Sequence, residues 1–129
     1  VFDLTGKCSL LASAAIIKRS RLLLANDSGL MHLAEAVGTP VIALFGSTAR
    51  ELGFFPQRST SRVLEHHNLH CRPCSHLGHH ACPRGHFRCM KEITPQRVLD
   101  EIKRTLDATT STKQIELRDT MTVIQKESF

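Results

Sequence analysis

Two kinds of segment alternate along the first half of the chain. Residues 22–25 and 41–45 are apolar at every position and have the length of a buried strand. Residues 10–18 and 30–37 instead repeat apolar side chains at helical spacing, which gives each segment one apolar face. Apolar strands that alternate with helices are typical of a parallel sheet whose two faces are both covered. The pattern therefore predicts an α/β fold, a Rossmann-like parallel sheet with helices on both faces.

Further elements are predicted on either side of this core. Residues 1–4 have the character of the end of a strand, and residues 61–65 have the character of one more short strand. A helix over 94–106 is indicated by Thr94 as its N-cap, by Pro95 at its first position and by apolar residues on one face. We therefore expect a final helix to close the domain.

The length of 129 residues corresponds to one compact domain. We assign residues 1–106 to it, with residues 66–92 as a basic loop segment rich in cysteine and histidine, called the Cys/His segment below. The polar residues 107–129 alternate weakly and are expected to form a weak strand pair or a loose tail. Val1 is not a methionine, so we expect the chain to be part of a longer protein. No apolar run approaches the roughly 20 residues of a membrane-spanning helix.

The net charge of +5 is concentrated in one part of the chain. Six basic and two acidic residues between positions 58 and 92 supply +4 of it, and seven of the eight histidines lie there as well. A basic segment indicates an anionic partner such as nucleotide phosphate, nucleic acid or acidic lipid, although a solvated surface is the simpler alternative. The absence of Trp and Tyr disfavours a protein that stacks single-stranded bases.

A loop over residues 26–32, called the Asp27 loop below, follows the first apolar strand. In a parallel sheet this is the carboxyl edge, where ligands bind. The N–H groups at a helix start favour a phosphate, and glycine lets a ligand approach the backbone closely. The residues that would meet it are Asp27, Ser28, Gly29 and His32. The structural alternative is a pair of caps, a turn and a histidine that belongs to the core.

Two more loops are candidates for the same edge. The loop called the Gly46 loop below, Gly46, Ser47 and Thr48, follows the next strand and presents N–H and hydroxyl groups. The loop called the Lys7 loop below precedes the first helix and contains Thr5, Gly6, Lys7, Cys8 and Ser9. Its lysine could reach a phosphate, or its wall could hold a base. Neither a P-loop nor the glycine fingerprint of dinucleotide-binding folds is present.

Four of the five cysteines lie within the Cys/His segment, and Cys8 stands apart. Cys71, Cys74, Cys82 and Cys89 have the spacing C-x2-C-x7-C-x6-C, whose first pair is typical of a zinc knuckle and whose second pair is wider than usual. An odd number of cysteines without a secretion signal argues against a disulfide framework. A metal-free reduced loop, a structural zinc site and disulfides all remain open.

Together these motifs resemble a known enzyme family. The signature of the ADP-heptose:lipopolysaccharide heptosyltransferases, glycosyltransferase family 9, is similar to the run NDSGLMHLAEAVGTPVIALFGST that begins at Asn26. The upstream LTGKCSL and the later CRPCSHLGHHACPRGHFRCMKEITPQRV also resemble segments of that family. The resemblance covers about residues 4–106. Ser28 and Cys8 stand where the family commonly has threonine, and Phe54 and Phe55 are a further departure. Cys8 and the Phe pair could alter donor preference.

The resemblance implies the C-terminal, donor-binding half of a two-domain GT-B glycosyltransferase. Such an enzyme moves heptose from ADP-heptose to the inner core of lipopolysaccharide with inversion. The Asp27 loop would meet the donor diphosphate and sugar, and the segment from Thr5 to Leu10 would line the adenosine pocket. Catalysis would need no metal, so a zinc ion held by the four cysteines would be structural.

The same resemblance implies where the remaining parts of the reaction lie. The general base and the lipopolysaccharide acceptor site would belong to an N-terminal half, so these 129 residues alone are expected to be inactive. We expect no nucleic-acid partner, a cytoplasmic location and peripheral contact with the inner membrane. The rival hypotheses are a small basic Cys/His module that binds zinc and nucleic acid, and a nucleotide-binding domain without catalytic activity.

Overall fold

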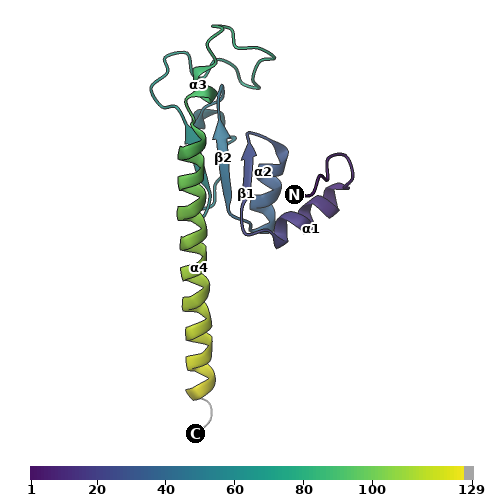
Figure 1. The fold of residues 1–129 in the computed structure, drawn as a ribbon, viewed down its shortest axis with the longest axis vertical. Coiled ribbons are helices and arrows are strands. Elements are labelled where there is room, and N and C mark those ends of the chain that lie inside the picture. The colour runs from purple at the N-terminus through teal and green to yellow at the C-terminus, as the bar shows by residue number, and fades with distance from the viewer. Residues whose placement is uncertain (127–129) are drawn as a thin grey trace.

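The computed structural model describes residues 1–126 and contains a parallel sheet of three strands (Figure 1). The strands are β1 (Leu23–Asn26), β2 (Val41–Phe45) and β3 (Arg62–Glu65), and they lie in the order β1-β2-β3. Asn26 pairs with Leu44, and Phe45 pairs with Glu65, so the three strands end at one edge of the sheet. The strands predicted over 22–25, 41–45 and 61–65 are confirmed to within one residue.

The described residues also form four helices and one short 3-10 turn around the sheet. Their bounds are α1 (Leu10–Arg19), α2 (Gly29–Val37), α3 (Arg88–Lys91), α4 (Pro95–Lys126) and the 3-10 turn η1 (Arg50–Leu52). Helix α2 packs on β1 and β2, and α1 packs on α2. The long helix α4 runs past the opposite side of the sheet and continues well beyond it (Figure 1). Within the described part of the chain, no helix has both the length and the apolar content that crossing a bilayer requires.

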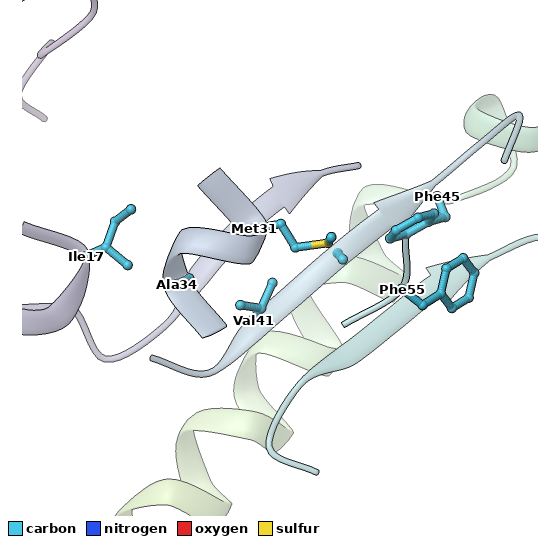
Figure 2. Close-up of a cluster of buried hydrophobic side chains, with 7 residues drawn as sticks. Ile17, Met31, Ala34, Val41, Phe45 and Phe55 are labelled. Atoms are coloured by element: carbon cyan, nitrogen blue, oxygen red, sulfur yellow. The ribbon is translucent and has the colours of Figure 1, made fainter. Parts of the chain in front are cut away.

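The central strand β2 shows why both faces of the sheet must be covered. Successive side chains of a strand point to opposite faces. Val41, Ala43 and Phe45 pack with Met31 of α2 and with other residues of the first apolar cluster (Figure 2). The alternate residues of β2 pack in a second cluster with the start of α4, whose members include Ile42, Leu44, Leu64, Ile93, Val98 and Ile102. The predicted α/β sheet with helices on both faces is therefore confirmed.

The helix boundaries follow from capping residues that the sequence shows. The Ser9 hydroxyl accepts a hydrogen bond from the Ala12 N–H at 3.2 Å and begins α1. Gly38 ends α2 with φ +83°, in the left-handed region that favours glycine. The Thr94 hydroxyl accepts from the Arg97 N–H at 3.3 Å, with Pro95 as the first residue of α4.

Two predicted elements are wrong. Residues 1–4 form no strand, because they pair with none of the strands in the described part of the chain, although β1 leaves one edge of the sheet free. Residues 107–126 form neither a strand pair nor a loose tail, because α4 continues through them. No glycine or proline interrupts the chain after Pro95, so nothing in the backbone ends the helix at 106. The weak alternation of apolar residues after 114 was therefore a misleading signal.

Glu35 of α2 is hydrogen-bonded to the loop that leads into β3. Its carboxylate accepts hydrogen bonds from the N–H groups of Gln57 and Arg58 and from the Ser61 hydroxyl, at 2.9 to 3.1 Å. Burial raises the pKa of Glu35, but these hydrogen bonds and the nearby His32 outweigh burial, so the net shift of the pKa is downward. The ionised carboxylate is therefore the form that the fold stabilises.

The lowered pKa predicts how stability depends on pH. Glu35 contributes stability that is fully present above its unfolded-state pKa and is lost as the pH falls through the lower folded-state pKa. We expect Glu35→Gln to lower the free energy of unfolding at pH 7, and we expect the gap to the unaltered chain to close in acid. Urea unfolding at pH 7, 5 and 3 measures this gap. A gap that stays constant down to pH 3 would contradict the role of the carboxylate charge.

Candidate functional site

The carboxyl edge of the sheet brings together two of the loops that the sequence singles out. The Asp27 loop follows β1, and the Gly46 loop follows its neighbour β2. The Thr48 hydroxyl, in a residue that is only 4% exposed, donates a hydrogen bond of 2.8 Å to Asp27 Oδ2. The Thr48 hydroxyl therefore orients Asp27, while a contact of the Gly46 loop with a phosphate stays a prediction. The second carboxylate oxygen, Oδ1, is the one left to meet a ligand.

The start of α2 is open to an incoming group. Ser28 occupies the N-cap position, yet its side chain makes no capping hydrogen bond, and the first turn contains no acidic side chain. The N–H groups in the first turn of an α-helix lack partners within the helix. A Cβ atom built on Gly29 would meet no other protein atom within 4 Å. Helix capping therefore does not account for Asp27 and Ser28, and the geometry suits an anion.

His32 lies one turn into α2 and is exposed. The structural alternative, a histidine belonging to the core, is therefore wrong. Its position places the ring on the helix surface above Ser28, because side chains four residues apart lie on the same face. The imidazole lies close enough to Glu35 to help lower the pKa of that carboxyl group. His32 is thus available beside the helix start.

The Lys7 loop is not joined to the other two loops. Its hydrogen bonds within residues 1–126 are local: Lys7 Nζ donates to the Asp3 carbonyl at 3.1 Å, and Ser9 caps α1. In Figure 1 this loop lies on the far side of α2 from the ends of β1 and β2. Its role as the wall of a nucleotide pocket, assigned to Thr5, Gly6, Lys7, Cys8 and Ser9, stays a prediction.

The Cys/His segment packs around the Gly46 loop. The Cys74 N–H donates to the Ser47 carbonyl at 3.1 Å. A Cβ atom on Gly46 would come within 2.8 Å of Met90 Sδ, so α3 and its flanks approach the loop closely. A larger residue at position 46 would therefore require the Met90 side chain to shift. The two segments are separate features of the sequence, but in the fold the Cys/His segment supports the Gly46 loop.

Arg72 is a residue of this site that the sequence analysis missed. Its side chain is 6% exposed and forms an ion pair of 2.8 Å with Glu65 at the end of β3. The guanidinium also donates to the carbonyl groups of Gly46, Thr48 and His66. In the sequence, Arg72 is one of several basic residues in its segment, and their simplest interpretation is a charged surface. The contacts place it in the interior instead.

The four cysteines of the Cys/His segment are free thiols, so the disulfide alternative is not what the structure shows. Cys71 Sγ lies 3.9 Å from His86 Nε2. Burial raises the pKa of Cys89, and Cys74 and Cys82 raise it further. Even so, no group of three or more His, Cys, Asp or Glu side chains within the described residues is arranged to hold a metal ion. The geometry therefore gives no support to a zinc site.

Structural zinc at Cys71, Cys74, Cys82 and Cys89 stays a prediction that metal content can decide. A bound ion would order the Cys/His segment, and a chelator would then loosen that segment while the sheet remained folded. We expect zinc to accompany the protein in stoichiometric amount if the hypothesis is correct. Elemental analysis after purification without added metal provides the measurement, and a zinc content far below one ion per chain would contradict the site.

The chain is similar to known proteins over the part that contains both loops. A family model described as glycosyltransferase family 9 (heptosyltransferase) matches residues 1–82. Lipooligosaccharide heptosyltransferase 2 of Campylobacter jejuni serotype O:6 is 35% identical over 83 residues, which are 64% of this chain and 25% of that protein. Lipopolysaccharide heptosyltransferase 2 of Escherichia coli K12 is 31% identical over 110 residues, which are 81% of this chain and 28% of that protein.

A third relative has a similar identity and coverage. Lipooligosaccharide heptosyltransferase 2 of Haemophilus influenzae is 31% identical over 108 residues, which are 81% of this chain and 29% of that protein. The chain thus spans between 25% and 29% of the length of these relatives. No solved structure matches it. Because the family model covers more than half of the chain, including the Asp27 loop and the Gly46 loop, the chain belongs to glycosyltransferase family 9, the heptosyltransferase family.

Proposed function

We propose that this chain is the donor-binding, C-terminal part of a GT-B heptosyltransferase that moves heptose from ADP-heptose to the inner core of lipopolysaccharide. The observation that carries the proposal is the carboxyl edge of the sheet. There an uncapped helix start and the carboxylate of Asp27, held by Thr48, lie together within the family's characteristic stretch. An uncapped helix start suits a diphosphate, and a carboxylate suits the hydroxyl groups of a sugar.

In this proposal the donor diphosphate lies at the start of α2. The first-turn N–H groups and the helix dipole would hold its negative charge, and they would stabilise the ADP leaving group as the sugar bond breaks. His32 would add a donor beside the same phosphates. Asp27 would accept a hydrogen bond from a sugar hydroxyl through Oδ1, since Oδ2 is engaged by Thr48. No step in this scheme requires a metal ion.

The rival module that binds zinc and nucleic acid is not favoured. Its two arguments were the cysteine spacing and the basic segment. No group of three or more His, Cys, Asp or Glu side chains among the described residues is arranged to hold a metal ion, and the Arg72 side chain is buried against Glu65 instead of facing solvent. The acceptor and the general base lie outside the residues that carry this proposal.

Gly29→Ala tests the donor site with little risk to the fold. The new methyl group meets no protein atom within 4 Å, and alanine is a better helix former than glycine by about 1 kcal/mol. We therefore expect the free energy of unfolding to stay equal or rise. The methyl group would keep a phosphate away from the backbone, so we expect the Kd for ADP, measured by calorimetry, to rise at least about tenfold, which corresponds to about 1.4 kcal/mol.

Ala36→Gly is the matched control on the same helix. Position 36 is exposed and lies two turns after Gly29, so this change should lower stability by about 1 kcal/mol and leave the Kd for ADP unchanged. Equal affinities in the unaltered chain and Gly29→Ala would contradict the placement of the diphosphate. A complete lack of ADP binding by the unaltered chain would contradict the proposed function itself.

A further inference from the structure

We infer that Arg72 is a positioning residue for the donor: through the backbone of the Gly46 loop, it directs the N–H groups of residues 47–49 toward the donor diphosphate. This inference rests on the proposed function. The inference gives the Cys/His segment a role in the donor site, although no residue of that segment contacts the donor in the proposed scheme. Arg72 does not touch the donor in this scheme and acts through the loop.

Three successive carbonyl groups of the Gly46 loop accept hydrogen bonds from the Cys/His segment. Arg72 Nε donates to the Gly46 carbonyl, and Arg72 Nη2 donates to the Thr48 carbonyl at 2.8 Å. The Cys74 N–H donates to the Ser47 carbonyl between them at 3.1 Å. Residues 72–74 therefore bind every carbonyl group of the Gly46 loop from the side of the Cys/His segment.

The N–H group of each of these peptide units then points away from the Arg72 or Cys74 donor that its carbonyl accepts from. In a trans peptide the carbonyl and the N–H of one unit point in opposite directions. The carbonyls of residues 46, 47 and 48 share their peptide planes with the N–H groups of Ser47, Thr48 and Ala49. Successive N–H groups that face one side of a turn form an anion-binding concavity. Beside the start of α2, this concavity would give the diphosphate a second set of donors.

The shape of the Arg72 side chain suits this task. A guanidinium has five N–H donors in a rigid fork, and Arg72 uses four of them, for three backbone carbonyls and the Glu65 carboxylate. A lysine ammonium has no such fork and could not hold both loop carbonyls in the same geometry. Glu65 balances the buried charge, which would otherwise be costly.

Arg72 is also linked to Asp27, through Thr48. Arg72 holds the Thr48 carbonyl, and the hydroxyl of the same Thr48 holds Asp27 Oδ2. A displaced Thr48 would therefore disturb both the N–H groups and the carboxylate of the proposed site. A residue that only supported the fold would change the stability without changing the affinity for the donor.

The test compares Arg72→Lys and Arg72→Gln with Arg62→Gln. Arg62 also donates to backbone carbonyls, those of Ser59 and Ser61, but it is 52% exposed and does not reach the Gly46 loop. We expect both Arg72 variants to raise the Kd for ADP about tenfold or more at a temperature well below unfolding, and Arg62→Gln to leave it unchanged. Arg72→Lys keeps a positive charge beside Glu65, so it serves where Arg72→Gln does not fold.

A second measurement does not depend on ADP. The backbone NMR order parameters of Ser47, Thr48 and Ala49 in the unliganded chain should fall in Arg72→Lys, while those of the central residues of β2 stay unchanged. If the order parameters of these three residues match those of the unaltered chain, the inference is overturned, whether or not ADP binds. If ADP binds the unaltered chain and Arg72→Lys with equal Kd, the inference is also overturned, and the proposed function stands.

Discussion

Asp27→Ala is expected to weaken the binding of ADP-heptose to this chain by about tenfold to a hundredfold, the range of a lost hydrogen bond to a charged group. Two changes act together. The sugar loses a carboxylate acceptor, and the Thr48 hydroxyl, in a residue that is 4% exposed, loses its partner. ADP, which has no heptose, should lose less affinity than ADP-heptose. Calorimetric titration of the two ligands measures the difference.

Asp100→Ala on α4 is the control for this prediction. Asp100 accepts a hydrogen bond from Gln96 on the surface of its own helix and contacts neither loop. Its replacement should leave the affinities for both ligands unchanged. If Asp27→Ala weakened ADP and ADP-heptose by the same factor, Asp27 would not be the acceptor for the sugar hydroxyl.

Phe45→Ala is expected to lower the free energy of unfolding by about 3–5 kcal/mol, the usual range for truncating a buried phenylalanine. Phe45 is fully buried at the end of β2, and its ring centroid lies 4.1 Å from that of Phe55 (Figure 2). A domain has a total stability of about 5–15 kcal/mol, so the loss is a large part of it. Urea unfolding followed by circular dichroism measures the change.

Phe54→Ala is the matched control, because Phe54 is next to Phe55 in sequence yet 37% exposed. Its replacement should change stability by about 0.5 kcal/mol or less. Phe55 belongs to the core, and an influence of the pair on donor preference stays a prediction. Comparable losses in the two variants would contradict this division between core and surface.

Local signals determined most of the first half of the fold. The apolar runs at 22–25 and 41–45 became β1 and β2, because a strand buried on both faces has no room for polar side chains. Gly38 and Thr94 marked helix ends correctly, because their effects on capping depend on neighbours only a few residues away.

The sequence pattern failed where an element depends on distant partners or on the lack of a stop signal. Residues 1–4 are apolar enough for a strand, but a strand exists only where another strand pairs with it. The predicted end of α4 at residue 106 rested on the polarity of the residues that follow. Polarity does not break a helix, so α4 continues to Lys126.

By itself, the sequence determined the α/β class, the Asp27 loop and the family, because each depends on residues that are contiguous or regularly spaced. Only the tertiary structure decided that Thr48 holds Asp27, and that Arg72, 24 residues further along the chain, holds Thr48. An arginine between a cysteine and a proline carries no local sign of burial. Arg72 holds Thr48 because the Cys/His segment packs against the ends of β2 and β3, and only long-range packing brings these parts together.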